Sequence, residues 1–306
     1  MSPCSTTPAT EPLTLESFRP FTLADRPVIE RAIPPELAEF CDFNFNNLVV
    51  WGRVLQELWR PYKRWLLLFN AETGNLAMPL GPWPSEAELT GLADEMKRAG
   101  GSGRVALVPE WYVAQHPGLA DHFRIEDDPD NADYVYSSDR LAELRGNLLA
   151  KKRNLVSQFL RNYPDFQCRP FPVGPSRHCL ELIDRWEEEK GGRNPELDIE
   201  RRALTLALEN YVELGYEGLC LHVGDTPVAL AIFSPQTADM VTVHFEKFDR
   251  RFKGASQMIN RETARLVRPR FAWINREQDM GDEGLRQAKR SYGPDRMLLP
   301  KLLTPR

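Results

Sequence analysis

The residues best suited to proton transfer lie in one alternating segment, residues 240–248. If this segment is a strand, alternation predicts one shared face for four side chains, Thr242, His244, Glu246 and Phe248. Glu246 is the best candidate for a general base, which an attacking ammonium requires because it has no lone pair. His244 is a neighbour whose ordinary pKa also suits proton transfer. The alternative for Glu246 is an ion pair with Arg276 or Lys289, or an exposed pair with Lys247.

Three consecutive cations, Lys151, Lys152 and Arg153, interrupt an apolar helical pattern in LLAKKRNLVSQF. At 100° per residue, Lys152 lies well inside the apolar face of a helix predicted over residues 139–163. An unpaired buried ammonium is strongly unfavourable. We therefore expect Lys152, with Lys151, Arg153 and the adjoining Asn154, to line a cleft between two halves and bind an anionic part of a donor or acceptor. The alternative is that its long stem reaches water or an ion pair.

Two further groups of polar residues follow the alternating segment. The text Arg251-Phe-Lys-Gly254-Ala255-Ser256 places a glycine at the start of an expected helix, where free N–H groups attract phosphate. An ordinary joint between loop and helix explains this pattern equally well. In Asn275-Arg276-Glu277-Gln278-Asp279, polar side chains crowd the end of a short expected strand. There, Asp279 or Asp282 is expected to cap the next helix.

Composition limits the class of protein. The 306 residues, 42% hydrophobic and 27% charged, suit two soluble domains of ordinary size. The first residues contain no secretory signal, and the longest apolar runs are far shorter than a membrane span, so a cytoplasmic location is expected. Five scattered cysteines without a CxxC pair indicate neither a disulfide framework nor a zinc ribbon, and no histidine cluster predicts a metal.

Charge is distributed unevenly. Residues 1–139 carry a net charge of −10, whereas residues 250–306 carry +8. This asymmetry suggests a basic surface that could meet a polyanion. The candidates for contact with an RNA backbone are Arg261, Arg265, Arg268, Arg270, Arg286, Lys289 and Arg290. A solvated basic face with no partner is the alternative.

The expected elements have a clear order in the second half. From residue 165 onwards they are strand 166–171, helices 176–189 and 196–214, strands 218–223, 228–234 and 240–248, helix 254–267, strand 271–275, helix 282–292 and strand 297–303. The first half is expected to contain strands at 64–69, 76–80 and 104–108, and a capped helix after Ser85.

This order resembles the GNAT acyltransferase fold, and three blocks sharpen the resemblance. They are DYVYSSDRLAELRGNLLAKKRN, VHFEKFDRRFKGASQMIN and INREQDMGDEGLRQAKRSYGP, residues 133–154, 243–260 and 274–294. They resemble signature blocks of soluble relatives of the C-terminal domain of phosphatidylglycerol lysyltransferase. The resemblance implies an α/β chain of two tandem GNAT-like domains, as in Fem-type transferases. The expected parts are a tail at 1–12, domains at 13–138 and 164–306, and a linking helix at 139–163.

The same resemblance implies an activity. Characterised membrane members move an aminoacyl group from a charged tRNA to a lipid head group; this chain lacks their membrane-spanning region, and its NREQDMG text departs from theirs. By analogy with GNAT enzymes, Glu246 is the base, Tyr292 the general acid, and the loop at Gly254 the phosphate site. Residues expected to bind or orient donor or substrate are Lys151, Lys152, Arg153, Asn154, Lys247, Arg251, Gly254, Ala255, Ser256, Asn275, Arg276, Glu277 and Lys289.

The donor is therefore expected to be an aminoacyl-tRNA or, as an alternative, an acyl-CoA, with no firm cofactor. The acceptor is an amine or hydroxyl of a small molecule or lipid head group. A non-catalytic ligand- or RNA-binding module of the same fold is the third interpretation. For Tyr292, packing at a helix end is the alternative to catalysis.

Overall fold

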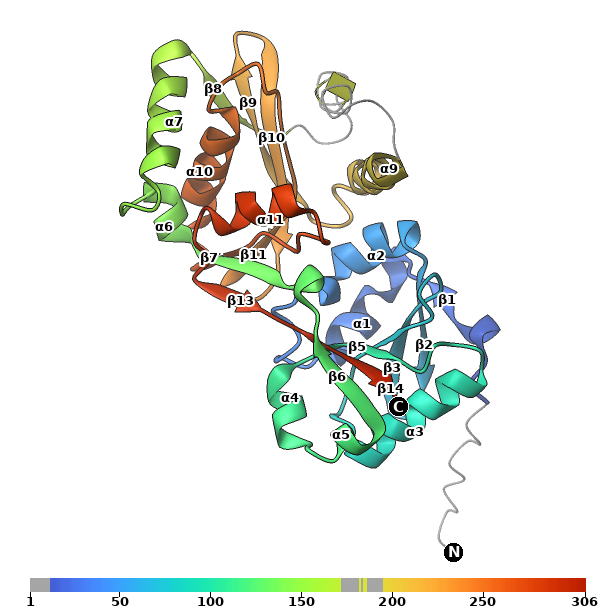
Figure 1. The fold of residues 1–306 in the computed structure, drawn as a ribbon. Coiled ribbons are helices and arrows are strands. Elements are labelled where there is room, and N and C mark those ends of the chain that lie inside the picture. The colour runs from blue at the N-terminus through green and yellow to red at the C-terminus, as the bar shows by residue number, and fades with distance from the viewer. Residues whose placement is uncertain (1–11, 172–181, 183, 186–194) are drawn as a thin grey trace, which may run out of the picture. The chain divides into compact units, whose positions relative to one another are not determined.

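The computed structural model describes residues 12–171, 182, 184, 185 and 195–306. Within them the chain forms two compact units (Figure 1). The first contains residues up to Pro34, Gln56–Asp127 and Pro300–Arg306, and the second contains Pro35–Leu55 and Asp128–Leu299. The sequence placed one boundary near residue 138 and kept each half continuous. Instead, the first unit also contains residues 300–306, of which 301–305 pair within its sheet, and the second unit also contains residues 35–55.

The first unit is built on a seven-stranded mixed sheet in the order β1-β2-β3-β4-β5-β14-β6. Its strands are β1 Arg19–Pro20, β2 Glu57–Tyr62, β3 Trp65–Asn70, β4 Leu76–Ala77, β5 Val105–Val108, β6 Phe123–Asp127 and β14 Lys301–Pro305. Its α-helices are α1 Arg26–Ala32, α3 Glu86–Arg98, α4 Glu110–Gln115 and α5 Leu119–His122. As expected, Ser85 caps α3: its hydroxyl accepts from the N–H of Glu88, whose carboxylate accepts from the N–H of Ser85.

The second unit contains another seven-stranded sheet, in the order β13-β7-β12-β11-β10-β9-β8. Its strands are β7 Asp133–Ser137, β8 Gln167–Pro170, β9 Glu217–Val223, β10 Thr226–Pro235, β11 Met240–Phe248, β12 Trp273–Asn275 and β13 Arg296–Leu298. Its α-helices are α2 Phe45–Val54, α6 Ser138–Glu143, α7 Ala150–Asn162, α9 Pro195–Glu209, α10 Ala255–Val267 and α11 Glu283–Arg290. Short 3₁₀ turns lie at 15–17 and 23–25 in the first unit and at 41–43 and 129–131 in the second. The expected tail lies outside the described residues, as does most of the expected helix at 176–189.

The expected succession of three antiparallel strands, helix and strand is confirmed. β9, β10 and β11 pair antiparallel, and α10 then leads to β12, which pairs parallel with β11. That parallel pairing ends at Thr242 and Asn275, whereas β11 continues to Phe248. The two strands therefore part beyond Thr242, and the last residues of β11 have no neighbouring strand on that side in the described structure.

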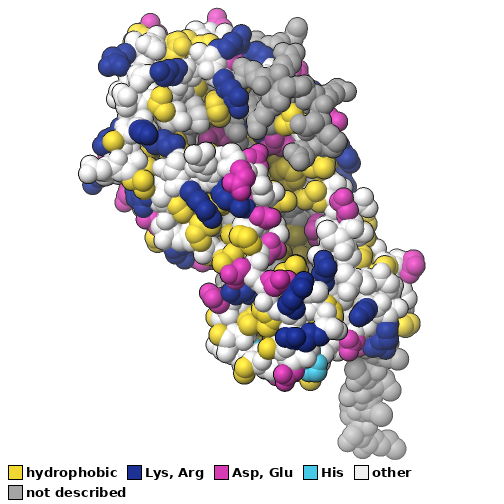
Figure 2. Space-filling view, viewed as in Figure 1, with side chains coloured by type: hydrophobic (Ala, Val, Ile, Leu, Met, Phe, Trp, Pro, Cys, Tyr) yellow, Lys and Arg dark blue, Asp and Glu magenta, His cyan; other side chains and the backbone are white. Residues whose placement is uncertain are grey.

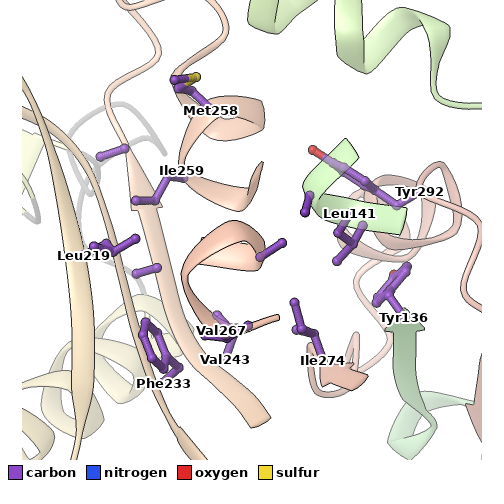
Figure 3. Close-up of a cluster of buried hydrophobic side chains, with 14 of the residues drawn as sticks. Tyr136, Leu141, Leu219, Phe233, Val243, Met258, Ile259, Val267, Ile274 and Tyr292 are labelled. Carbon is purple, nitrogen blue, oxygen red and sulfur yellow. The ribbon is translucent and has the colours of Figure 1, made fainter. Parts of the chain in front are cut away.

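The sheet of the second unit carries helices on both faces. On one face, α10 packs with α6 and α7 over an apolar core (Figure 3) that includes Val243, Ile259 and Tyr292. On the other, Trp51 of α2 stacks on Phe245 of β11, with 5.8 Å between ring centroids, and α9 packs beside α2. The apolar side chains thus divide the sheet into an α10 face and an α2 face.

Two expected elements are each divided. The helix predicted over 139–163 is two helices, because Leu144 adopts φ +51° and Gly146 φ +88° between α6 and α7. Arg153 then donates from Nη1 to the carbonyl oxygens of Leu144 and Gly146, which stabilises the break. The last predicted strand is divided near Pro300, which lacks an N–H for a ladder, and β13 and β14 lie in different sheets.

Candidate functional site

A β-bulge in β11 separates the two residues that alternation placed on one face. Ile232 of β10 pairs with Phe245, whereas the next residue, Phe233, pairs with Val243, so His244 is the extra residue. Val243 therefore faces α10 and Phe245 faces α2. The phase inverts at His244, and the prediction that His244 and Glu246 share a face is wrong.

Glu246 faces α10 and is bound by a guanidinium. Arg276, directly after β12, donates from Nη2 to Glu246 Oε1 at 3.1 Å, and both side chains are largely buried, at 13% and 14% exposed. Asn260 of α10 donates to Oε2 over a long 3.4 Å, and the Oδ1 atom of Asn260 has no partner among the described residues. The ion pair with Arg276, one of the two roles considered for Glu246, is thus present. It keeps a carboxylate at the point where β11 and β12 part.

A second cation lies over the aromatic ring beside this pair. The Nζ of Lys152 is 4.3 Å from the ring centroid of Tyr292, and the guanidinium carbon of Arg276 is 5.2 Å from the same centroid. Burial, and then the charge of Arg276, lower the pKa of Lys152. Among the described residues, Lys152 has no carboxylate within ion-pair distance. We call Lys152, Glu246, Asn260, Arg276 and Tyr292 the α10-face site.

The two cations of this site lie over the ring of Tyr292. Its side chain is only 4% exposed, and burial raises the pKa of its hydroxyl well above the ordinary value. The phenol therefore stays protonated and is able to donate, though not to act as a base. Two cations, one carboxylate and a protonated phenol in one place can bind an anion, accept one proton and supply another.

His244 belongs to a different set of contacts on the α2 face. Its Nε2 lies 2.8 Å from the Ser234 hydroxyl, and its Nδ1 lies 2.8 Å from Asn47 Oδ1 and 2.9 Å from Glu277 Oε1. Because both neighbours of Nδ1 are acceptors, that nitrogen carries the proton and Nε2 accepts from Ser234. Asn47 also donates to Glu277. These four residues form the His244 network.

The His244 network resembles a Ser–His–Glu hydrogen-bond chain in its connectivity. However, the side chain of His244 is fully buried, and Ser234 is only 2% exposed. Tyr216 packs edge-on against the imidazole. Because both ring nitrogens of His244 and the Ser234 hydroxyl have partners inside the protein, we interpret the network as a structural link between α2 and the sheet.

The turn after β12 connects the two faces. Asn275 donates to Asp133 and to the carbonyl of Glu39, whereas Arg276 contacts the α10 face and Glu277 the His244 network. Glu277 has φ +58°, which is uncommon for a residue with a side chain. Asp282, one of the two residues expected to cap this helix, caps α11 by accepting from the N–H of Leu285.

Several predicted binding residues have partners within the protein. Lys247 is buried on the α2 face against Glu200, and Arg251 forms an ion pair with the fully buried Asp249. Arg153 holds the break between α6 and α7 through two backbone carbonyls. By contrast, Lys151 and Asn154 are exposed, and Ser256 is partly exposed.

The predicted phosphate loop is covered by α7. Gly254 has φ +92°, and a Cβ there would collide with the carbonyl oxygen of Leu155 and lie 3.0 Å from Phe159 Cβ. The close approach of α7 thus accounts for the glycine without a ligand. Ala255 is buried, and its N–H donates to Phe252.

The basic residues predicted to contact RNA are mostly ion-paired. Arg261 and Arg265 pair with Glu262, Arg268 with Glu143, Arg270 with Glu217, and Arg286 with Asp279 and Asp130. On the face shown in Figure 2, basic and acidic side chains lie next to one another at several places. The excess of +8 in residues 250–306 is therefore offset by acidic partners, several of them in earlier parts of the chain.

One group in the described structure has atoms close enough to hold a metal ion, namely Cys41, Asp42 and Asp133. Asp133 already accepts from the N–H and thiol of Cys41 and from Asn275. Burial raises the pKa of Asp133 to about 6. These hydrogen bonds account for the cluster as an internal anchor for residues 39–41.

Sequence reasoning missed Asn47 and Ser234 of the His244 network. The available signal was FNFNN at residues 43–47, three asparagines around an otherwise apolar helix start. The side-chain amide of each asparagine has a partner in the fold, since Asn44 binds Gln236, Asn46 binds the carbonyl of Leu214, and Asn47 binds Glu277. The pattern is informative because buried amides require partners.

Comparison with known proteins agrees with this architecture. Residues 37–301 match the family described as phosphatidylglycerol lysyltransferase, C-terminal. A conserved protein of unknown function from Bacteroides thetaiotaomicron VPI-5482 is 31% identical, with a TM-score of 0.85 over 94% of this chain and 99% of that chain. Among curated proteins, no sequence matches this chain.

More distant structures share the fold. L-PGS from Bacillus licheniformis is 13% identical, with a TM-score of 0.58 over 89% of this chain and 92% of that chain. A tandem GNAT protein from the clavulanic acid biosynthesis pathway is 9% identical, with a TM-score of 0.52 over 93% and 97% of the two chains. The expected fold class, two tandem GNAT-like domains, is thereby confirmed.

Within the described residues, the helices are too short or too polar to cross a bilayer. Family and fold together indicate a GNAT-like transferase of acyl or aminoacyl groups. The match over residues 37–301 covers most of the sequence. The chain therefore belongs to the family of the phosphatidylglycerol lysyltransferase C-terminal domain.

Proposed function

We propose that this protein transfers an aminoacyl group from a charged tRNA to an amine or hydroxyl acceptor such as a lipid head group. The observation that carries the proposal is the α10-face site, where a carboxylate and two cations surround a buried tyrosine at the parting of β11 and β12. Membership of a lysyltransferase family supports the choice of an aminoacyl donor.

The chemistry follows from the residue types. Glu246 takes a proton from the attacking amine or hydroxyl, whose nitrogen or oxygen then forms a bond with the ester carbonyl carbon. Arg276 stabilises the oxyanion that develops on the carbonyl oxygen, while Lys152 contacts the donor. As the ester C–O bond breaks, Tyr292 donates a proton to the departing ribose oxygen. The ion pair with Arg276 holds the Glu246 carboxylate in place until the acceptor arrives.

Two lysines of α7 are better candidates for a contact with RNA than the arginines expected from the sequence. Most of the predicted arginines are already paired with carboxylates, whereas Lys151 is exposed and Lys152 has no carboxylate partner among the described residues. We therefore place the cationic contact with the donor at α7. Each phosphate neutralised by a lysine makes binding more salt-dependent.

A transfer assay tests the proposal. The protein is incubated with a pool of tRNAs charged with radiolabelled amino acids, and label is counted in lipid, peptide and protein fractions. Lys152→Ala should weaken donor binding or transfer about tenfold, the effect of losing one charge-assisted contact. Arg161→Ala, which removes an exposed charge near the other end of α7, is the control and should have a smaller effect. Wild-type transfer by Lys152→Ala would contradict the proposal.

An acyl-CoA donor is the alternative, because a tandem GNAT protein shares the fold. If the donor is an acyl-CoA, acetyl-CoA stabilises the protein in a thermal-shift experiment. Binding of charged tRNA in a salt-sensitive gel shift, without stabilisation by acetyl-CoA, supports the aminoacyl donor instead. If acetyl-CoA does not stabilise the protein, charged tRNA does not bind and no transfer occurs, a non-catalytic module of the same fold is favoured.

A further inference from the structure

Lys289 has an unusual environment for a lysine. It lies near the end of α11, is only 7% exposed, and donates from Nζ to the carbonyl oxygens of Arg276, at 2.7 Å, and Gln278. These two carbonyls flank Glu277, the residue with φ +58°. The sequence predicted that this ammonium binds substrate, but it donates to backbone carbonyls instead.

The backbone at Lys289 is itself fixed. Tyr136 of β7 donates from its hydroxyl to the Lys289 carbonyl at 2.8 Å, and the ring of Tyr134 lies 5.6 Å from Nζ. The lysine therefore connects a rigid strand to the turn after β12. Without its ammonium, two carbonyls in this interior would lose their donor, which is unfavourable.

The turn that Lys289 holds points its side chains in opposite directions. Arg276 reaches Glu246 in the α10-face site, whereas Glu277 reaches His244 and Asn47 on the α2 face. Consecutive side chains already point to opposite faces in extended backbone, but here Glu277 adopts the left-handed φ of +58°. Such a conformation persists only when surrounding contacts over-determine it.

We infer that Lys289 is a positioning residue, whose ammonium holds the Asn275–Gln278 turn so that Arg276 faces the transfer site while Glu277 closes the His244 network. The role of Arg276 in catalysis rests on the proposed function; the control of the turn does not. Lys289 touches neither donor nor acceptor in this arrangement. It acts through Arg276 and Glu277, whose side chains it orients.

Charge on Lys289 is sensitive to pH. Burial lowers the pKa of Lys289 to about 8, with Glu277, Cys41 and Asp133 acting to raise it and Arg276 to lower it. Five neighbouring groups have pKa values that are shifted. The pKa of Asp133 is raised only to about 6, that of Cys41 lies well above its ordinary value, and those of Tyr134, Tyr136 and Arg276 are also raised. Loss of the lysine proton above pH 8 should therefore loosen the turn.

The test follows the turn directly by NMR, with ¹⁵N-labelled histidine and arginine in the full chain. In the wild type, the ring signals of His244 and the Nε signal of Arg276 should shift together with a midpoint near pH 8. Lys289→Met should show, at about pH 7, the shifts that the wild type reaches at about pH 9.5, where a group with a pKa near 8 has lost its proton. Lys289→Arg keeps its charge and should hold the wild-type shifts at about pH 7 without a step near pH 8.

Gln287→Met places the same new side chain on an exposed position of α11 and should titrate like the wild type. If Lys289→Met keeps wild-type His244 and Arg276 signals at neutral pH, or retains the step near pH 8, the inference is overturned. Should Lys289→Met fail to fold, the wild-type and Lys289→Arg titrations still decide, since a step that survives in Lys289→Arg also overturns it.

The transfer assay adds a second measurement. It distinguishes failure of the positioning role from failure of the proposed function. Displacing Arg276 should lower kcat roughly 10- to 100-fold in Lys289→Met, with a smaller change in KM for charged tRNA. Lys289→Arg should restore kcat at neutral pH and extend it above pH 8. If no transfer occurs with any variant, the proposed function fails, while the NMR shifts still test the positioning role.

Discussion

The two faces of the second unit's sheet place polar residues in opposite circumstances, although Glu246 and His244 are only two positions apart on β11. On the α2 face, both ring nitrogens of His244 have partners and its side chain is enclosed. On the α10 face, Lys152 has no carboxylate partner among the described residues, and the Oδ1 atom of Asn260 has no partner there. A satisfied network stabilises a fold, whereas an incompletely satisfied one is suited to a ligand.

The bulge at His244 produces this separation. Regular alternation would have placed a titratable histidine next to the carboxylate, on one side of the strand. One inserted residue sends the imidazole to α2 and leaves Glu246 with Arg276. The comparison thus assigns chemistry to Glu246 and structure to His244, and variants at each position should separate the two roles.

Glu246→Gln is expected to have the largest effect on activity. The amide keeps the shape but cannot accept a proton, so transfer should fall about 100- to 1,000-fold while the protein remains folded. Product formation in the charged-tRNA assay, with circular dichroism for folding, measures both. Glu262→Gln is the matched control, because Glu262 is also a carboxylate paired with arginine but lies on α10.

The Glu262→Gln control should keep transfer within about twofold of the wild type, because Glu262 pairs with Arg261 and Arg265, which lie outside the α10-face site. Equal losses in both variants would indicate a general electrostatic effect instead of a base. Full activity in Glu246→Gln would contradict the catalytic role assigned to Glu246.

His244→Ala is expected to affect stability more than chemistry. It deletes a buried ring and leaves Ser234, Asn47 and Glu277 without a common partner, so the free energy of unfolding should fall by about 2–4 kcal/mol. Urea unfolding measures the loss, and transfer per folded molecule should stay within about tenfold of the wild type. A catalytic loss as large as that of Glu246→Gln would show that the network participates in the reaction.

Gly254→Ala tests whether α7 depends on its close approach to α10. The new Cβ would collide with the carbonyl of Leu155 at a residue with φ +92°, so unfolding free energy should fall by about 1–3 kcal/mol. Movement of α7 would also carry Lys152 away from Tyr292 and reduce donor binding. Gly91→Ala, where a Cβ meets nothing within 4 Å in helix α3, should stabilise instead, by roughly 0.5–1 kcal/mol.

Much of the fold was predictable because its signals are local. The turn at Gly224-Asp225 and the apolar runs on either side predicted the bounds of β9 and β10 to within two residues, and Ser85 predicted the start of α3. The division of the helix at Leu144 was not predictable, because apolar periodicity alone continued through it. The entry of β14 into the sheet of the first unit depends on strands far from it in sequence, and no local pattern specifies such pairing.

The site was predicted in part, for a related reason. Glu246, Arg276 and Tyr292 were singled out, and Lys152 was expected to face inwards. The contact that organises them, however, depends on the bulge, which only the register of β10 against β11 reveals. Likewise, Lys289 was expected to meet a ligand, since a sequence does not show that two backbone carbonyls already occupy its ammonium.

The smallest effect is expected from the arginines of the charge-rich C-terminal segment. Because Arg265 is paired with Glu262 and Arg270 with Glu217, neither presents an uncompensated charge to RNA. Arg265→Ala and Arg270→Ala should therefore change affinity for charged tRNA by less than about twofold and leave its salt dependence unaltered, whereas Lys152→Ala should reduce that dependence by roughly one unit in the log–log slope. Gel shifts across a salt series measure both. A lower slope in the arginine variants would move the donor contact away from α7, to the outer surface of α10.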